Sequence, residues 1–217
     1  MKRYFIIGTD TDCGKTYVTC QLLDYFKAAN QRTMAIKPVI SGVDVDDSNM
    51  HLQRYNGDVN QNISRWAFKR PISPHLAAEE EVQQICIQSL VDFCFDPGFA
   101  YVDNLLIESA GGLMAPLNYQ ETWIDVLLLS QIPVILVVGM RLGCLNHALL
   151  TELALRSHKI QCIGWIANCI DKDMLALPNN ISTLIQKLQS PLLATIPYGG
   201  TLVSMPMFGN NISNSVT

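Results

Sequence analysis

The residues with the clearest chemical signature form a glycine-bounded segment near the N-terminus. Gly8 and Gly14 enclose a short loop that follows the apolar run 4–7 and ends in Lys15-Thr16, where a helix is predicted to begin. This is the pattern of a phosphate-binding P-loop, in which glycines let the backbone wrap around an anion and the amides of a helix start face it. We expect Lys15 to reach the β- and γ-phosphates of a nucleotide and the Thr16 hydroxyl to hold Mg²⁺. An ordinary glycine-rich turn is the alternative.

Three further polar residues, Lys37, Glu108 and Asn168, each stand at the end of an apolar run. Ligands bind beyond the carboxyl ends of the strands in a parallel sheet, so these side chains should gather near the P-loop. Glu108 is placed like the carboxylate that holds Mg²⁺ in P-loop enzymes, and helix N-capping is its alternative role. The Asn168 amide could read the edge of a nucleotide base through a paired donor and acceptor. A solvated lysine at a strand end is the alternative for Lys37.

The elements that must position these residues alternate along the chain, and continuous apolar strands between helices indicate a parallel sheet covered on both faces. We predict strands at 3–8, 32–39, 104–109, 133–139, 161–168 and 192–196. We predict helices at 15–29, 79–95, 123–129, 145–157 and 180–188, with a short polar segment at 44–55 that can also be helical. The fold class is therefore α/β, a P-loop NTPase-like parallel sheet with helices on both faces. We expect residues 1–217 to form a single domain with a loosely held polar tail at 201–217.

The composition limits the cellular location and the binding partners that we expect for the chain. The chain has 217 residues, of which 49% are hydrophobic and 16% charged, and a length of this kind fits one compact domain with a sizeable core. A net charge of −4 gives no basic field that would favour nucleic acid or an anionic membrane. The apolar run 132–140 is far shorter than a membrane span, and the N-terminal run is too short for a signal peptide. Seven cysteines without a C-x-x-C pair predict reduced thiols and a cytoplasmic location.

Six segments, taken in order along the chain, resemble the dethiobiotin synthetase family. They are 8–16, 37–42, 71–75, 108–112, 142–148 and 164–168. The P-loop is generic, whereas Lys-Pro-x-x-Ser-Gly and Leu-Gly-Cys-x-Asn-His are much more specific. The resemblance implies a Mg-ATP-dependent cyclo-ligase that converts 7,8-diaminononanoate, CO₂ and ATP to dethiobiotin, ADP and phosphate. It also implies a homodimer whose substrate site lies at the subunit interface.

The family mechanism has three steps. One amine captures CO₂ as a carbamate, the carbamate oxygen takes the γ-phosphoryl group of ATP, and the second amine closes the ureido ring with loss of phosphate. The resemblance implies that Lys15 clamps the γ-phosphate and that Lys37 stabilises the carbamate and the transferring phosphate, which are both anionic. Thr11 and Ser41 would offer hydroxyls to the carbamate or an amine, and a turn residue before Gly42 is the alternative for Ser41.

The resemblance implies further binding residues. The nucleotide would contact Asp12, Cys13, Gly14, Lys15, Thr16, Tyr17, Asn168, Pro197 and Tyr198. The distal carboxylate of the substrate would meet a helix start supplied by the partner subunit, formed by Gly143, Cys144, Leu145 and Asn146. Mg²⁺ would be held by Thr16, Asp47 and Glu108. We expect Cys144 to present its backbone N–H rather than a nucleophilic thiol, and His147 to pack rather than transfer protons.

The chain departs from the family pattern at three places. Asp12 replaces a glutamate, which keeps the charge but shortens its reach by about one methylene group. Ser109 replaces a glycine, so a β-carbon stands where backbone approached a ligand. The second metal aspartate has no clear counterpart: an ungapped count reaches Ser48, we choose the adjacent Asp47, and a solvated acidic turn is nearly as good an interpretation.

A P-loop switch ATPase of the partitioning or division-site type is the alternative function. Such proteins share the fold but carry an extra lysine early in the P-loop, and residues 8–13 contain none. The chain also shows no amphipathic basic tail for membrane binding. A third hypothesis, an amide-forming relative that acts on cobyrinic acid, is weakened because the chain is too short for the glutaminase domain of such enzymes.

Overall fold

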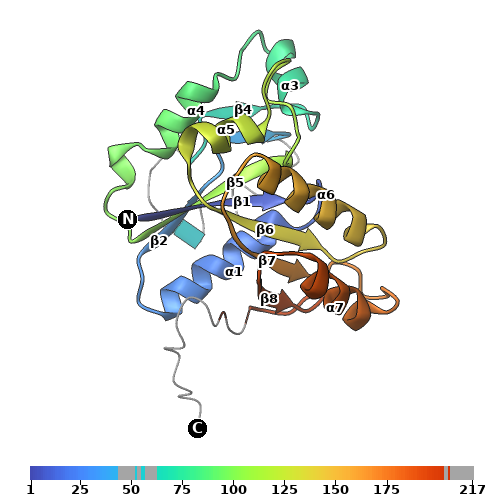
Figure 1. The fold of residues 1–217 in the computed structure, drawn as a ribbon. Coiled ribbons are helices and arrows are strands. Elements are labelled where there is room, and N and C mark those ends of the chain that lie inside the picture. The colour runs from blue at the N-terminus through green and yellow to red at the C-terminus, as the bar shows by residue number, and fades with distance from the viewer. Residues whose placement is uncertain (44–51, 53–54, 57–62, 203–204, 206–217) are drawn as a thin grey trace.

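A parallel sheet of six strands, in the order β2-β5-β1-β6-β7-β8, forms the centre of the molecule (Figure 1). The computed structural model describes residues 1–43, 52, 55–56, 63–202 and 205. The strands are β1 Lys2–Gly8, β2 Thr33–Ile36, β5 Asn104–Gly112, β6 Val134–Gly139, β7 Cys162–Asn168 and β8 Leu192–Ile196. Their apolar runs are buried because helices cover both faces, and this confirms the predicted fold class.

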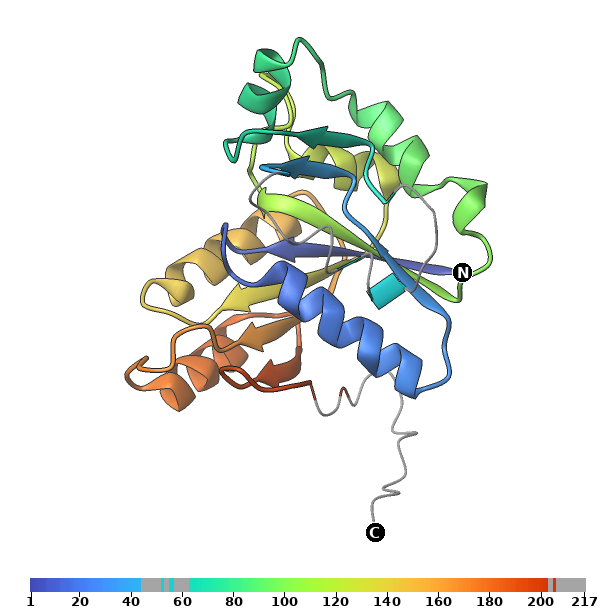
Figure 2. The same cartoon turned by 180° about the vertical axis from the view of Figure 1, so that it is seen from behind.

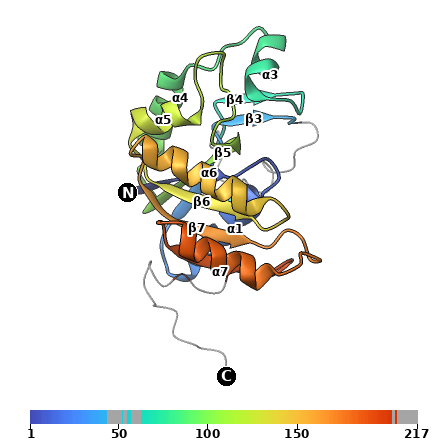
Figure 3. The same cartoon turned by 45° about the vertical axis from the view of Figure 1, so that its right-hand side comes forward.

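The helices lie on opposite faces of this sheet. Helix α1, Lys15–Ala28, covers one face, and the other face carries α5, Trp123–Ser130, α6, Cys144–Ser157, and α7, Leu177–Lys187 (Figures 1 and 2). Figure 3 shows α6 and α7 lying alongside one another over β6 and β7. Each strand end therefore feeds a loop at one common edge of the sheet, where ligands of such folds bind.

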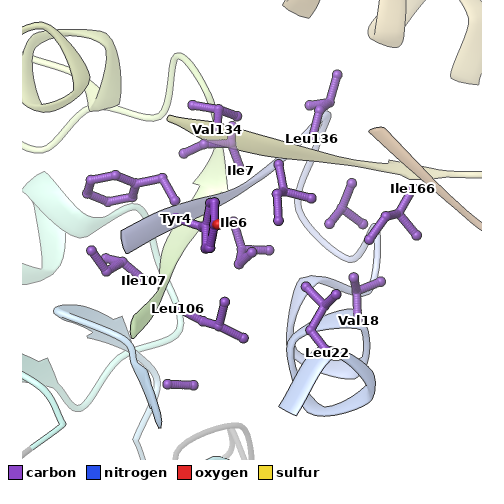
Figure 4. Packing of buried hydrophobic residues seen from close by; sticks show 14 of the residues in the cluster. Tyr4, Ile6, Ile7, Val18, Leu22, Leu106, Ile107, Val134, Leu136 and Ile166 are labelled. Atoms are coloured by element: carbon purple, nitrogen blue, oxygen red, sulfur yellow. The ribbon is translucent and has the colours of Figure 1, made fainter. Parts of the chain in front are cut away.

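Packing between α1 and the sheet fixes the start of that helix. Val18 and Leu22 turn from α1 toward the strands and belong to one buried cluster with Ile6, Leu106 and Ile166 (Figure 4). Burying one such side chain contributes about 1.5–3 kcal/mol to folding. The loop between β1 and α1 is thus held at both ends by well-packed elements.

The strand predicted at 32–39 is wrong in its second half. The chain leaves the central sheet after Ile36 and forms β3, Val39–Ser41, which pairs in parallel with β4, Trp66–Phe68, in a separate two-stranded sheet. Proline has no N–H to donate to a ladder, so the Lys37-Pro38 step is a natural place for the strand to break. Strand β4 was not predicted, because a run of three residues carries almost no periodic signal.

The helix predicted at 79–95 is also wrong, since the chain forms two shorter helices. They are α3, Pro74–Glu80, and α4, Ile87–Cys94, followed by a 3-10 turn at Pro97–Phe99. Between them Val82 takes a left-handed φ of 53° and is exposed, while Ile85 is buried in the core. The chain turns there to bury Ile85, and tertiary packing overrides a sequence without an internal glycine or proline.

The segment 201–217, for which a loosely held tail is expected, is described at three positions. The backbone N–H of Leu202 donates to Gln21 Oε1 at 2.9 Å, and the hydroxyl of Tyr25 donates to the carbonyl of Met205 at 3.2 Å. Both Leu202 and Met205 are buried, so the chain here is packed against α1. In the described part of the chain, no helix combines the length and the apolar character needed to cross a membrane.

Candidate active site

The P-loop joins β1 to α1 in a tightly curled conformation. Gly14 is the N-cap of α1 with a φ of +83°, and a β-carbon there would collide with the side-chain amide of Asn168, so only glycine fits. Five residues separate Gly8 from Gly14, whereas the usual pattern has about four, and Asp12 also takes a left-handed φ of 56°. The loop is therefore one residue longer than the usual pattern.

Lys15 is folded over this loop. Its side chain is 8% exposed, and Nζ donates to the backbone carbonyl of Asp10 at 3.2 Å. The next residue, Thr16, donates its hydroxyl proton to Oε1 of Glu108 at 2.6 Å. The first turn of α1 thus carries one cation and one hydroxyl at the mouth of the loop, as the sequence predicts.

Lys37 and Glu108 form a buried ion pair beside the P-loop. Lys37 Nζ lies 3.3 Å from Glu108 Oε1, and the two side chains are 9% and 1% exposed. Glu108 lies within β5 rather than at a helix start, so the helix-capping alternative is wrong. Lys37 is buried, so the solvated-lysine alternative is also wrong. Taking two charges out of water is costly, and mutual attraction together with the Thr16 hydrogen bond offsets that cost.

A cavity of about 650 Å³ opens between these groups. Its walls come from the P-loop, the end of β2, the start of α1, the segment 71–74 and the end of β5. The lining residues predicted from the sequence are Thr11, Asp12, Lys15, Thr16, Lys37 and Ser41. In all, two lysines and five hydroxyl side chains line this space, and they would suit an anionic ligand rich in oxygen atoms.

Three buried polar atoms near this cavity have no hydrogen-bond partner among the described residues. They are Glu108 Oε2, Ser41 Oγ and Ser109 Oγ. An unmade hydrogen bond inside a protein costs about 1–3 kcal/mol, so such atoms point to a missing ligand. A carboxylate oxygen beside a threonine hydroxyl is a donor set that suits Mg²⁺. Glu108 and Thr16 therefore fit a bound magnesium ion. Within the residues described, no cluster of three His, Cys, Asp or Glu side chains could hold a metal ion, and Asp47 lies outside them.

The residues predicted to surround the nucleotide base lie on the other side of the P-loop. Asn168 is buried at the end of β7, and its Nδ2 donates to the carbonyl of Cys13 at 3.0 Å. Tyr17 donates its hydroxyl proton to the carbonyl of Gly200, and Pro197 and Tyr198 are exposed just after β8. The structure brings these residues to the same edge of the sheet. It also gives Asn168 a structural partner that sequence reasoning did not foresee.

The start of α6 stands apart from the cavity. Gly143 is its N-cap with a φ of +94°, and Leu142 before it is 96% exposed. Leu145 is half-buried and Asn146 is exposed, and none of this turn belongs to the described lining of the cavity. Cys144 is buried, and burial raises the pKa of its thiol, which disfavours the thiolate that a nucleophile needs.

Sequence reasoning missed an ion pair between the P-loop and the segment before α6. Arg141 Nη2 bonds Oδ2 of Asp10, whose Oδ1 also accepts the N–H of Thr11 at 2.8 Å. His147, for which packing is expected, is instead half exposed, with Nδ1 4.0 Å from the same Asp10 oxygen. Asp10 and Arg141 are 131 positions apart, so no local pattern could have revealed the pair.

A second cavity of about 600 Å³ lies between the end of α1 and the start of β2, where Asp24, Lys27 and Arg32 are among its lining residues. It is close to the amino end of β2, away from the P-loop and the carboxyl ends of the strands. None of the predicted site residues lines it. The first cavity, which holds the buried lysines, is therefore the candidate site.

Together, the parallel sheet, the phosphate loop after its central strand β1 and the carboxylate on neighbouring β5 define a P-loop nucleotide-binding protein. The septum site-determining protein MinD from Pyrococcus horikoshii OT3, solved with Mg-ADP, has a similar fold, with a TM-score of 0.54 over 90% of this chain and 81% of that one. The identity to it is 18%, so this likeness describes the fold alone. A family model described as an AAA domain matches residues 2–205.

Curated relatives narrow the class to one family. The ATP-dependent dethiobiotin synthetase BioD of Legionella pneumophila (strain Corby) is 51% identical over 93% of this chain and 96% of its own length. The protein of the same name from Cellvibrio japonicus (strain Ueda107) is 38% identical over 90% of this chain and 89% of its own length. The chain belongs to the ATP-dependent dethiobiotin synthetase family. These relatives favour that activity over the switch ATPase weighed as its alternative.

Proposed function

We propose that this chain forms the ureido ring of dethiobiotin from 7,8-diaminononanoate and CO₂ at the expense of ATP. The observation that carries the proposal is a cavity among the described residues in which two buried lysines and several hydroxyls converge, in a chain of this family. A carbamate and a transferring phosphoryl group are both anionic, and a low-dielectric site with fixed cations stabilises both.

Different side chains would serve each of the three chemical steps. Thr11 and Ser41 line the cavity with hydroxyls that can hold the first amine and its carbamate, and the buried Ser41 Oγ lacks a protein partner. Lys37 then neutralises the carbamate oxygen as it takes the phosphoryl group, and Lys15 follows the γ-phosphate after exchanging its bond to Asp10. Most of the rate enhancement comes from positioning and charge neutralisation, as in other phosphoryl transfers.

The nucleotide is proposed to lie along the P-loop, with phosphates on the backbone amides of residues 12–17. Asn168 keeps one amide proton on the Cys13 carbonyl and can turn its remaining proton and its oxygen to the adenine edge. Pro197 and Tyr198, exposed beyond β8, would form the opposite wall. Asn168 would thus couple base recognition to the shape of the loop.

Mg²⁺ is proposed to be held by the Thr16 hydroxyl and by Glu108, whose Oε2 has no protein partner among the described residues. When bound, such an ion neutralises charge on the β- and γ-phosphates. Asp47 remains the proposed second carboxylate.

We also propose that two chains associate through α6 and share the site. Leu150 and Leu153, 56% and 59% exposed, are three positions apart and lie on one face of α6, and Leu142, 96% exposed, lies just before the helix. Within the turn 143–146 the N–H of Cys144 donates to the carbonyl of Arg141 at 3.0 Å, so it does not serve the ligand as expected. The remaining N–H groups of this turn would receive the distal carboxylate of a substrate held by the partner. Seven free thiols support a reducing, cytoplasmic setting for this dimer.

The test is turnover by the purified protein supplied with 7,8-diaminononanoate, bicarbonate and MgATP. We expect dethiobiotin and phosphate in equal amounts, with dethiobiotin identified by mass. A calorimetric titration of the diamine in the presence of a non-hydrolysable ATP analogue should show micromolar binding that weakens when Ser41 or Asn146 is changed to alanine. Hydrolysis of ATP without the diamine product would contradict the proposal.

A further inference from the structure

The segment 71–75 is the one family motif to which the proposed reaction gives no task. Pro71, Ile72, Ser73 and Pro74 nevertheless line the cavity that holds Lys15 and Lys37. They belong to the segment from the end of β4 to the start of α3. A polar group in this wall faces the same space as the reacting atoms.

Ser73 has an unusual hydrogen bond for its position. It is the N-cap of α3, where a serine hydroxyl normally accepts a backbone N–H from the first turn, yet its side chain makes no such bond. Instead Ser73 Oγ lies 2.9 Å from Nδ1 of His75. The hydroxyl is therefore aligned with an imidazole rather than with the helix.

The imidazole of His75 is held from the side by an aromatic ring. Tyr119 packs against it edge to face, with centroids 5.5 Å apart and planes at 83°. The Tyr119 hydroxyl donates to Glu79 Oε2 at 2.8 Å, and this hydrogen bond raises the pKa of the tyrosine. Tyr119, from the segment before α5, and Glu79, on the same helix α3, are the titratable groups nearest to His75 in these contacts.

The reaction needs a proton acceptor. Each amine must lose a proton when it forms a bond to carbon, once on capturing CO₂ and once on closing the ring. Among the described lining residues, Lys15 and Lys37 are cations with hydrogen-bonded or paired ammonium groups, and Asp12 stands at the exposed rim. A neutral imidazole behind a hydroxyl is a well-suited acceptor near neutral pH.

Resting on the proposed function, we propose that Ser73 and His75 form a proton-accepting pair for the amines. In ring closure, the lone pair of the second amine attacks the carbonyl carbon of the carbamic-phosphoric anhydride, and phosphate leaves with the electrons of the broken C–O bond. The proton of that nitrogen passes to Ser73 Oγ while the hydroxyl proton of Ser73 passes to His75 Nδ1. Ser73 is unchanged and His75 becomes an imidazolium, which later releases its proton to water.

Three variants separate proton acceptance from mere orientation. His75→Asn keeps a hydrogen-bonding group close to the place of Nδ1 but cannot accept a proton, His75→Ala removes both functions, and Ser73→Ala removes the relay. His158→Asn is the matched control, because His158 also contacts a serine hydroxyl, that of Ser157 at 3.2 Å, on the exposed end of α6.

We expect all three cavity variants to lower kcat about 100-fold near pH 8 with the KM for ATP unchanged, and the control to match the wild type. The ratio of wild-type to His75→Asn rates should shrink as the pH falls, because an imidazole that already carries a second proton cannot accept another. Circular dichroism and ATP binding check the fold, and Ser73→Ala, which deletes one oxygen, carries the test if a His75 variant fails to fold.

Two results would overturn the inference. Wild-type rates in His75→Asn beside a slow His75→Ala would mean that His75 only orients Ser73. A rate ratio that does not change with pH would mean the same. If the wild type itself makes no dethiobiotin, the proposed function fails first, so the two failures are told apart by the wild-type assay.

Discussion

The two regions proposed to bind ligands differ in how buried and how well bonded their residues are within one chain. Around the P-loop, Lys15 at the start of α1, Lys37 after β2 and Glu108 within β5 are at most 9% exposed and already bonded to protein atoms. At the start of α6, Leu142 is 96% exposed, and a β-carbon on Gly143 would meet nothing within 4 Å. One region is preorganised within a single chain, and the other presents an open surface.

This difference has a physical meaning. Charged groups that stabilise a transition state must be fixed before the reaction, because reorganising them would raise the barrier. Recognition of a distal carboxylate needs only N–H donors, such as free backbone amides and the exposed Asn146 side chain, which a second chain can bring at the moment of assembly. Under the proposed function, the buried region would carry the chemistry and the open one would select the substrate.

The largest effect should follow from breaking the buried region. Glu108→Gln removes the charge that faces Lys37 Nζ at 3.3 Å, and we expect turnover to fall about 1,000-fold. The free energy of unfolding should also fall, by about 3 kcal/mol, because a buried ammonium loses its counter-charge. Steady-state kinetics and urea unfolding measure the two effects.

The double variant Lys37→Gln/Glu108→Gln sharpens this test. Two neutral amides can bond to one another, so we expect it to regain part of the lost stability and none of the lost turnover. Recovery of turnover together with stability would show that the pair serves only the fold.

Mixing two inactive variants tests whether the open region serves a partner. Lys15→Gln damages the P-loop and Asn146→Ala the α6 start, and each alone should lower turnover at least about 100-fold. After subunit exchange, half of the dimers carry one intact composite site, so the mixture should regain about a quarter of wild-type activity. If exchange is proven by mass spectrometry and activity stays low, both regions act on the same chain.

A charge on the apolar face of α6 should separate the subunits. Leu153, 59% exposed, can become aspartate without creating a cavity, and we expect a monomer in sedimentation and about tenfold weaker turnover. Leu175→Asp, at a residue 87% exposed before α7, is the control and should remain dimeric. A dimer that survives Leu153→Asp would place the interface elsewhere.

The same contrast explains what the sequence could predict. Buried strands appear in the sequence as apolar runs, and the P-loop is a local pattern. The sheet and the positions of Lys15, Thr16 and Glu108 can therefore be predicted from the sequence. The break after Ile36 and the division between α3 and α4 depend on what packs against them. Val82 shows this, since its left-handed φ has no signature in its residue type.

Contacts between distant segments could not be predicted from the sequence for a similar reason. The Asp10–Arg141 ion pair and the Asn168–Cys13 hydrogen bond join residues more than 100 positions apart, and no alternation or spacing encodes them. The Ser73–His75 contact is local, and the Ser-Pro pair does mark the start of α3. There the motif was visible, but its chemistry appeared only with the cavity beside it.

The smallest effect is expected at Cys144, which stands in the open region but is itself buried. Burial raises the pKa of its thiol, so at neutral pH the thiolate fraction is lower than in a free cysteine and rises only as the pH rises. Cys144→Ala should keep turnover within about threefold of wild type and cost about 1 kcal/mol of unfolding free energy. Iodoacetamide should label the exposed Cys86 first, because backbone and side-chain hydrogen bonds from Ser89 lower the pKa of that thiol. Loss of activity in step with labelling of Cys144 would mean that the α6 start supplies a reacting group as well as amides. That result would contradict the proposed separation of chemistry in the buried region from substrate selection in the open one.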